Sequence, residues 1–300
     1  MAWSDMATHH SANATTDGLV SQAMNTQRDP MPTSPFVGSD RTHATIARHG
    51  CVAVIKIDAG PVNAVSPRTM VDVCAALASA RDDPTVKAVV LGHAGKHFVA
   101  GADYDFLASL KTATAQQIWQ DVYRHFQGFI RMLYSYPKPT VAAIGGAAFT
   151  VGCEAALACD FRVVTESAVF EESWIRLGMM PPLGGLKMLP ALIGYGKAAD
   201  MILRARRVGG VEAVHIGLAH MLAPADELEV RAIGLASELA DAPPLAYQAA
   251  RTGMRRALEN SLEDTLAASA NQQALLILSD DFREGVDAAM AKRKPVFKGQ

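Results

Sequence analysis

The chain has 300 residues, half of them apolar, and a formal net charge of -2. This length and apolar content suffice for a full hydrophobic core in one large or two modest domains. Because basic and acidic residues nearly balance, no excess positive charge is available to bind a nucleic-acid backbone. No apolar run reaches the roughly 20 residues needed to cross a bilayer. We therefore expect no nucleic acid and no membrane as principal partner.

The cysteines show no C-x-x-C pair and no nearby histidines at zinc-ligand spacing. This pattern predicts reduced, mostly buried thiols, no metal site and a cytoplasmic location. The four positions are Cys51, Cys74, Cys153 and Cys159.

The N-terminal segment, residues 1–43, is rich in Ser, Thr, Asn, Asp and Pro. It has neither the apolar centre of a signal peptide nor a helical period. We predict that it is a disordered tail.

Strand and helix signals alternate from residue 44 to about residue 205. A β-branched run at 52–57 ends at a Gly-Pro turn and predicts a strand. Ser66 and Pro67 then open a helix, because serine caps free amides and proline is tolerated in the first turn. That helix should end near 81–84. Further strands are predicted at 86–91, 140–144 and 161–165, and further helices at 103–110, 115–134 and 151–158.

This alternation predicts an α/β core over residues 44–205. Beyond it, apolar residues recur mainly at spacings of three and four. Residues 206–300 are therefore predicted to form a helical C-terminal region.

Two glycine-bearing turns, residues 99–103 and 145–154, can present backbone amides to a ligand. Small residues let a ligand approach the chain, and amides at a helix N-terminus are uncompensated donors that the helix dipole reinforces. Such donors can hold an oxyanion.

In their order and sequence these turns resemble the enoyl-CoA hydratase/isomerase (crotonase) superfamily. The resemblance runs from about residue 44 to residue 300. The matching segments are the Asn-Ala motif at 61–65, the F-x-A-G-A-D loop at 97–103, the glycine-rich C-E-x-A-x-x-C-D segment at 144–160, the L-G-x-x-P-x-x-G-G segment at 177–185 and the C-terminal signature at 281–297.

The resemblance implies a spiral of β-β-α turns followed by a helical segment that mediates trimers, often paired into hexamers. It implies an acyl-CoA thioester as substrate, with coenzyme A as part of that substrate and no permanently bound cofactor. In this family two backbone amides polarise the thioester carbonyl, and by alignment they belong to Ala102 and Val151. A glycine is usual at the latter position, so the branched side chain of Val151 is expected to narrow the acyl pocket. Substrate-binding roles are implied for Ala64, Ala100, Gly101, Trp174 and Lys292.

Glu154 matches the first catalytic glutamate of the hydratases, and a partly buried carboxylate there could act as general acid or base. The second glutamate should lie twenty positions further on, at Trp174, whose indole has no proton that titrates in the useful range. Glu171 and Glu172 are close in sequence, but either would need a local slip of the chain to take that place. The sequence thus indicates an acyl-CoA enzyme with one matched acid/base residue.

Enoyl-CoA isomerisation or a variant hydration fits this site first. Decarboxylation of a malonyl-type thioester is the enzymatic alternative, because it forms the same enolate with less proton transfer, and thioester hydrolysis or carbon-carbon lysis follows. A different class of function is a catalytically weak acyl-CoA-binding protein, which Val151 and Trp174 favour and which Glu154 and both loop motifs oppose.

Overall fold

The computed structural model describes residues 42–300. In that range the chain forms a six-stranded, a three-stranded and a two-stranded sheet with helices around them. The tail predicted for residues 1–43 lies outside the described residues, apart from its last two positions.

The six-stranded sheet has the order β1-β2-β4-β6-β8-β11 and is parallel except between β1 and β2. A parallel sheet covered on both faces buries successive side chains on opposite sides. In β2, Ala53 and Ile55 belong to the main core, whereas Val52 and Val54 belong to a second cluster with α9. The strands are β1 (Ala44–His49), β2 (Val52–Ile57), β4 (Ala88–His93), β6 (Thr140–Ile144), β8 (Phe161–Thr165) and β11 (Met221–Ala223).

The two smaller sheets hold the short strands that lead into the candidate site. β3 pairs parallel with β5, β7 pairs parallel with β9, and β10 lies antiparallel to β9. Successive turns of the chain add one strand to the large sheet, one to a small sheet and then a helix, as in β6, β7 and α5. The short strands are β3 (Ala64–Val65), β5 (Gly101–Ala102), β7 (Ala147–Phe149), β9 (Val169–Glu171) and β10 (Val208–Gly209).

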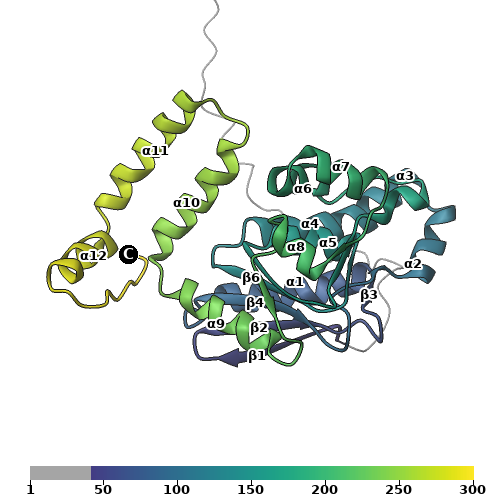
Figure 1. Ribbon diagram of the computed structural model, residues 1–300, viewed down its shortest axis with the longest axis horizontal. Helices are drawn as coiled ribbons and strands as arrows, with labels where there is room; N and C mark the ends of the chain where they lie inside the picture. The colour runs from purple at the N-terminus through teal and green to yellow at the C-terminus, as the bar shows by residue number, and fades with distance from the viewer. Residues whose placement is uncertain (1–41) are drawn as a thin grey trace, which may run out of the picture. The chain divides into compact units, whose positions relative to one another are not determined.

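Helices cover both faces of the large sheet (Figure 1). α9 packs against β2, β4, β6 and β8 on one face, while α1, α4 and α5 enclose the main core on the other. The helical elements are α1 (Pro67–Asp82), α2 (Tyr104–Ser109), η1 (Leu110–Thr112), α3 (Ala115–Gln117), η2 (Ile118–Tyr123), α4 (Arg124–Tyr134), α5 (Val151–Ala158), η3 (Ser173–Leu177), α6 (Gly185–Ile193), α7 (Tyr195–Leu203), α8 (Gly210–His215), α9 (Leu228–Ala240), α10 (Pro244–Ala257), α11 (Leu262–Ile277) and α12 (Asp280–Met290).

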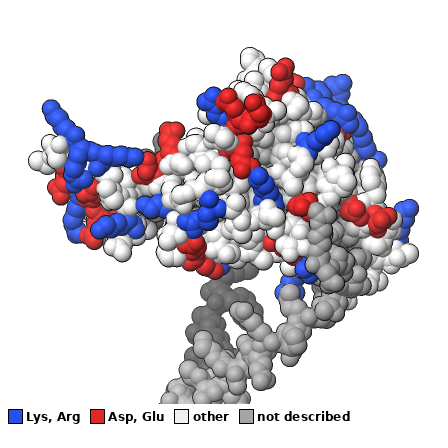
Figure 2. Space-filling view, turned by 90° about the horizontal axis from the view of Figure 1, so that it is seen from below, with Lys and Arg blue, Asp and Glu red and all other residues white. Residues whose placement is uncertain are grey.

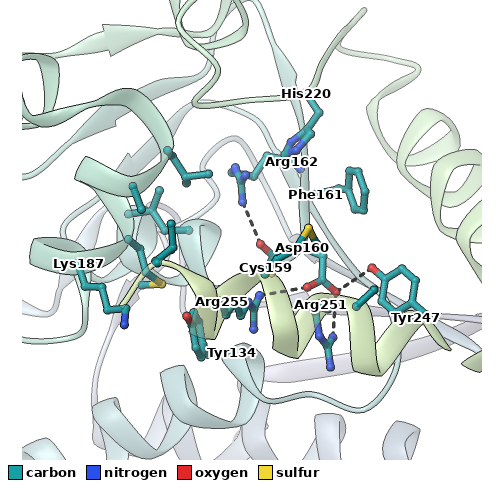
Figure 3. Close-up of a pocket in the computed structure, with 17 residues that line it drawn as sticks. Tyr134, Cys159, Asp160, Phe161, Arg162, Lys187, His220, Tyr247, Arg251 and Arg255 are labelled. Atoms are coloured by element: carbon teal, nitrogen blue, oxygen red, sulfur yellow. Dashed lines mark hydrogen bonds and ion pairs between the residues drawn. The ribbon is translucent and has the colours of Figure 1, made fainter. Parts of the chain in front are cut away.

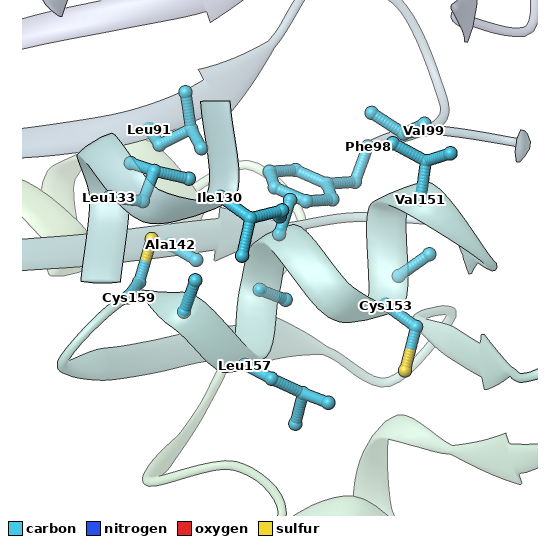
Figure 4. Close-up of a cluster of buried hydrophobic side chains, with 14 of the residues drawn as sticks. Leu91, Phe98, Val99, Ile130, Leu133, Ala142, Val151, Cys153, Leu157 and Cys159 are labelled. Carbon is cyan, nitrogen blue, oxygen red and sulfur yellow. The ribbon is translucent and has the colours of Figure 1, made fainter. Parts of the chain in front are cut away.

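α5, the helix that begins at the second glycine-bearing turn, is fully enclosed, since all eight of its residues are buried. Figure 4 shows Val151 on the side of α5 toward Phe98, and Cys153 and Leu157 on its other side, all within the main buried cluster. Because interiors are close-packed, this surrounding core fixes the axis of α5 and the direction of its N-terminus.

Most predicted elements are confirmed, several at the same residues. The strand predicted at 86–91 instead forms at Ala88–His93, because Val86 still closes a turn by donating to the Asp83 carbonyl at 3.1 Å. Residues 115–134 are helical throughout, although the stretch Ile118–Tyr123 is a π-helix.

The region after residue 205 contains a strand that the sequence does not predict. β11 has three residues, too few to show a strand period, and it pairs parallel with β8 at the edge of the large sheet. α9 follows and packs on that sheet. The domain boundary at 205 remains a prediction, and packing against the sheet continues to residue 240.

α10, α11 and α12 follow the core (Figure 1) and confirm that the C-terminal region is mostly helical. α11 has no buried residue, and several leucines along α10–α11 and just beyond are more than half exposed: Leu258, Leu262, Leu266, Leu275 and Leu278. On the face seen in Figure 2, basic and acidic side chains are interspersed. Within residues 42–300 no helix is long and apolar enough to span a membrane.

Candidate active site

The two glycine-bearing turns lie side by side. The Val99 N–H donates to the Ala147 carbonyl, and the Phe149 N–H donates to the Val99 carbonyl, both at 2.9 Å. Val99 thus pairs with the strand that leads into α5, although the two turns are almost fifty residues apart in the sequence. The structure therefore brings together the two motifs that were predicted to supply amides.

The contact continues to the residues that precede the predicted donors. Gly101 has a φ of 110°, and a Cβ on it would lie 2.9 Å from Thr150 Oγ1. Ala102 follows Gly101, and Val151 follows Thr150. Both predicted oxyanion donors consequently belong to segments in direct contact.

The backbone of Thr150 is strained directly before α5. Its φ of 46° and ψ of -106° lie outside the regions that a β-branched residue normally adopts, and its N–H donates to the Glu171 carbonyl at 2.8 Å. Val151 is the first residue of α5, so its N–H has no acceptor within the helix and carries the positive end of the helix dipole. Its side chain is buried in the main core beside Val99 (Figure 4).

Asn63 fixes the first turn, a role the sequence motif did not reveal. Its buried side chain donates to the carbonyls of Ile57 and His97, both at 3.0 Å, and accepts from the Ala59 N–H at 2.7 Å. Its own carbonyl accepts from the Ala100 N–H at 3.2 Å. Ala64, the next residue, pairs with Gly101 between β3 and β5. Backbone hydrogen bonds and strand pairing thus join the segment of Ala64 to that of Ala100 and Gly101, all predicted binding residues.

Glu154 lies one turn into α5 and is fully buried. Its Oε1 accepts from the N–H groups of Leu183 at 2.9 Å and Gly185 at 2.7 Å, whereas its Oε2 has no hydrogen-bond partner in the part of the chain that the structure describes. Burial raises the pKa of Glu154 to about 7, and the two backbone N–H groups oppose that shift. One oxygen is therefore anchored, and the raised pKa makes the protonated carboxyl group more favourable than it would be in water.

Trp174 occupies the position expected for the second carboxylate, and it is buried beside Glu154. Its indole N–H has no acceptor at hydrogen-bond geometry, yet it lies close enough to lower the pKa of both Glu154 and Glu172. Trp174 therefore lies beside both carboxyl groups.

Glu172 also approaches Glu154, although the sequence motif assigns it no position in the site. Glu172 is fully buried, and a Cβ on Gly185 would lie 3.2 Å from Glu172 Oε1 and 3.0 Å from Glu154 Oε1. Both carboxyl groups therefore approach one point. The physical reason is that β9 ends at residue 171, and the residue after it turns inward before η3 begins. Burial, reinforced by the charge of Glu154, raises the pKa of Glu172 well above its usual range.

Glu171 has a different role from its neighbour. Its carboxylate forms ion pairs with Arg176 at 2.9 Å and with Arg207 at 2.7 Å, and both arginines are more than half exposed. The adjacent glutamates thus point in different directions, one toward charged partners at the surface and one toward Glu154.

The two ends of the 97–103 loop have structural roles, and Lys292 has a peripheral position. His97 Nδ1 accepts from the Ala147 N–H at 3.1 Å, so this ring fixes the turn before α5. Asp103 caps α2 by accepting from the Phe106 N–H at 2.9 Å. Lys292 is exposed beyond α12 and makes no ion pair with any described residue. The structure does not bring Lys292 into contact with the other predicted site residues.

A separate cavity of about 360 Å³ lies between the end of α5, α6 and α10 (Figure 3). At its wall Asp160 is paired with Arg251 and Arg255, both at 3.1 Å, and accepts from the Tyr247 hydroxyl at 3.2 Å. None of its lining residues is Glu154, Glu172 or Trp174. Within residues 42–300 no group of three His, Cys, Asp or Glu side chains is placed to hold a metal ion.

Comparison with known proteins places this geometry in a family. The family model for enoyl-CoA hydratase/isomerase matches residues 47–300. The chain belongs to the enoyl-CoA hydratase/isomerase family. A probable enoyl-CoA hydratase of Rhodobacter capsulatus is 34% identical over 254 residues, covering 83% of this chain and 95% of that protein. A peroxisomal Delta(3,5)-Delta(2,4)-dienoyl-CoA isomerase of Arabidopsis thaliana is 32% identical over 246 residues, covering 79% and 88%.

Solved structures agree with this membership. An enoyl-CoA hydratase from Bacillus anthracis matches with a TM-score of 0.79 and 29% identity, covering 86% of this chain and all of that one. The chain has the crotonase fold and is an acyl-CoA-processing enzyme of the enoyl-CoA hydratase/isomerase type. Because hydratases and an isomerase are both among its relatives, the family does not by itself determine the reaction.

Proposed function

We propose that the enzyme polarises the thioester carbonyl of an enoyl-CoA between the backbone N–H groups of Ala102 and Val151. The contact between Gly101 and Thr150 supports this role, because it places the two following residues at neighbouring positions. Developing negative charge on the carbonyl oxygen would be stabilised by both amides and by the dipole of α5. Losing one such donor costs roughly 3 to 4 kcal/mol of transition-state stabilisation.

The environment of Glu154 is the main support for this proposal. Its anchored Oε1 holds the carboxyl group in place, its Oε2 has no protein partner, and its pKa of about 7 lets it take and return a proton at neutral pH. We assign it as acid/base toward the acyl group, in an enoyl-CoA isomerisation or hydration.

The test is mass-spectrometric turnover of a mixed panel of enoyl-, malonyl- and aroyl-CoA thioesters by the purified enzyme. We expect a mass gain of one water, or an isomer separable by chromatography, from the enoyl esters alone. Loss of carbon dioxide from the malonyl ester would instead identify a decarboxylase, and release of free CoA would identify a hydrolase. Tight binding of the esters without any product would contradict catalysis and support the acyl-CoA-binding alternative.

We further propose that the enzyme acts in the cytoplasm, takes coenzyme A only as part of its substrate and keeps no bound cofactor. Lys292 is proposed to reach CoA phosphate groups. Its exposure and its lack of an ion pair leave its charge available for such a contact.

A homotrimer, or a dimer of trimers, is the proposed assembly. The exposed leucines of α10–α11 support it, because several large apolar side chains exposed on neighbouring helices are typical of an interaction surface. Light scattering on the full chain should therefore give three or six times the 31.9 kDa chain mass. Leu262→Glu combined with Leu266→Glu should lower that mass, whereas a monomeric wild type would rule the assembly out.

A further inference from the structure

Glu172 presents an energetic problem that the proposed role of Glu154 does not solve. Its side chain is fully buried, and neither carboxyl oxygen meets hydrogen-bond geometry with a described residue, although the Cys153 thiol and the Trp174 indole lie close enough to lower its pKa. Burying a carboxyl group without partners is unfavourable, so such groups are rare in folded proteins and are often functional. No ion pair from residues 42–300 compensates Glu172, in contrast to the adjacent Glu171.

Several buried polar atoms that lack a hydrogen-bond partner within residues 42–300 lie close to one another around Glu172. They are both oxygens of Glu172, Oε2 of Glu154 and the indole N–H of Trp174. Gly185 lies between the two carboxyl groups, since any Cβ there would come within 3.2 Å of an oxygen of each. Two carboxyl groups and the indole N–H of Trp174 therefore converge on one buried region next to Gly185.

Contacts of the residues on both sides of Glu172 fix the direction of its side chain toward the interior. On one side, Glu171 is held by its two arginines, and its carbonyl accepts from the N–H of Thr150. On the other side, η3 begins at Ser173 and buries Trp174. Glu171, the residue before Glu172, is thereby bonded to the strained residue that precedes the proposed oxyanion donor Val151.

The two carboxyl groups differ in their backbone hydrogen bonds, and this difference indicates which of them holds a proton. Oε1 of Glu154 receives two backbone N–H groups, which stabilise its charged form, whereas Glu172 receives none. Two carboxyl groups this close do not both ionise readily, so a single proton on the pair resides on Glu172. Glu154 is then the carboxylate and Glu172 the acid.

We propose that Glu172 is the second acid/base residue of this enzyme and that the pair performs hydration of an enoyl-CoA. This inference rests on the function proposed above. Glu154 removes a proton from water as the water oxygen bonds to C3, and the electrons of the C2=C3 bond move toward the thioester carbonyl. Glu172 gives its proton to C2. The product is a 3-hydroxyacyl-CoA, and the pair still holds one proton, now on Glu154.

The test compares Glu172→Gln, Glu172→Leu and the control Glu166→Gln on the enoyl-CoA that the wild type hydrates. Glu166 is an exposed glutamate in the turn before β9 and is not among the residues assigned to the site. We expect kcat to fall at least 100-fold in both Glu172 variants, with little change in KM, and to stay at the wild-type level in the control. General acid-base residues typically contribute 10²–10⁴-fold.

A stability measurement separates this role from a purely structural one. Replacing an unpartnered buried carboxyl group with an apolar side chain removes its desolvation cost, so Glu172→Leu should unfold at a higher temperature than the wild type. An inactive variant that is also more stable supports the proposal. A variant that loses activity only by unfolding, or that keeps the wild-type kcat, overturns it.

The failure of this inference is distinguishable from failure of the proposed function. If the wild type hydrates enoyl-CoA and Glu172→Gln does so equally well, only the role of Glu172 is wrong. If the wild type converts no acyl-CoA thioester, the proposed function itself fails.

Discussion

Replacing Glu154 with glutamine is expected to lower kcat by roughly 10² to 10⁴-fold, the usual contribution of a general acid or base. The carboxamide has the shape of the carboxyl group, and its oxygen can still accept from the N–H groups of Leu183 and Gly185. It cannot take up a proton. Steady-state kinetics on the ester identified in the panel would measure the loss, and calorimetric titration should show that the affinity for that ester changes only a few-fold.

The pH dependence gives this prediction a second readout. A base must be ionised to act, so the wild-type kcat/KM should fall as the pH drops below the Glu154 pKa of about 7. The remaining activity of Glu154→Gln should lose that acidic limb. An unchanged kcat, or an acidic limb that survives the substitution, would show that another group is the base.

Replacing Asp160 with alanine is expected to lower the free energy of unfolding by about 3 to 5 kcal/mol, as is usual when one partner of a buried ion pair is removed. Asp160 pairs with Arg251 and Arg255 and accepts from Thr140 and Tyr247. Its side chain is only 6% exposed, and that of Arg251 only 7%. The alanine variant leaves buried positive charge without a counterion, and it loosens α10 from the end of α5.

Urea unfolding at one fixed chain concentration would measure this effect, because assembly makes apparent stability depend on concentration. Asp82→Ala is the matched control. Asp82 also forms an ion pair, with Arg81, but its side chain is 66% exposed, and exposed pairs contribute little. Equal midpoints for Asp160→Ala and Asp82→Ala would contradict the importance of the buried network.

The motifs of the sequence were sufficient for the family, the glycine-bearing turns and the place of Glu154. These features depend on short-range chemistry. A β-branched run forms a strand, a glycine permits a positive φ, and a residue at the fourth position of a helix lies one turn from its start. The strand at 140–144 and α5 at 151–158 accordingly appear at the predicted residues.

Only the tertiary structure decided that Glu172 faces Glu154 while Glu171 faces two arginines. No local period distinguishes two adjacent glutamates at the end of a strand. Their directions depend on how β9 pairs with β7 and β10 and on where η3 and α6 pack. The strand β11, three residues long, was hidden for the same reason, since its stability comes from pairing with β8. Sequence determines what each segment prefers to form, whereas burial and charge at the site depend on neighbours that folding brings from distant parts of the chain.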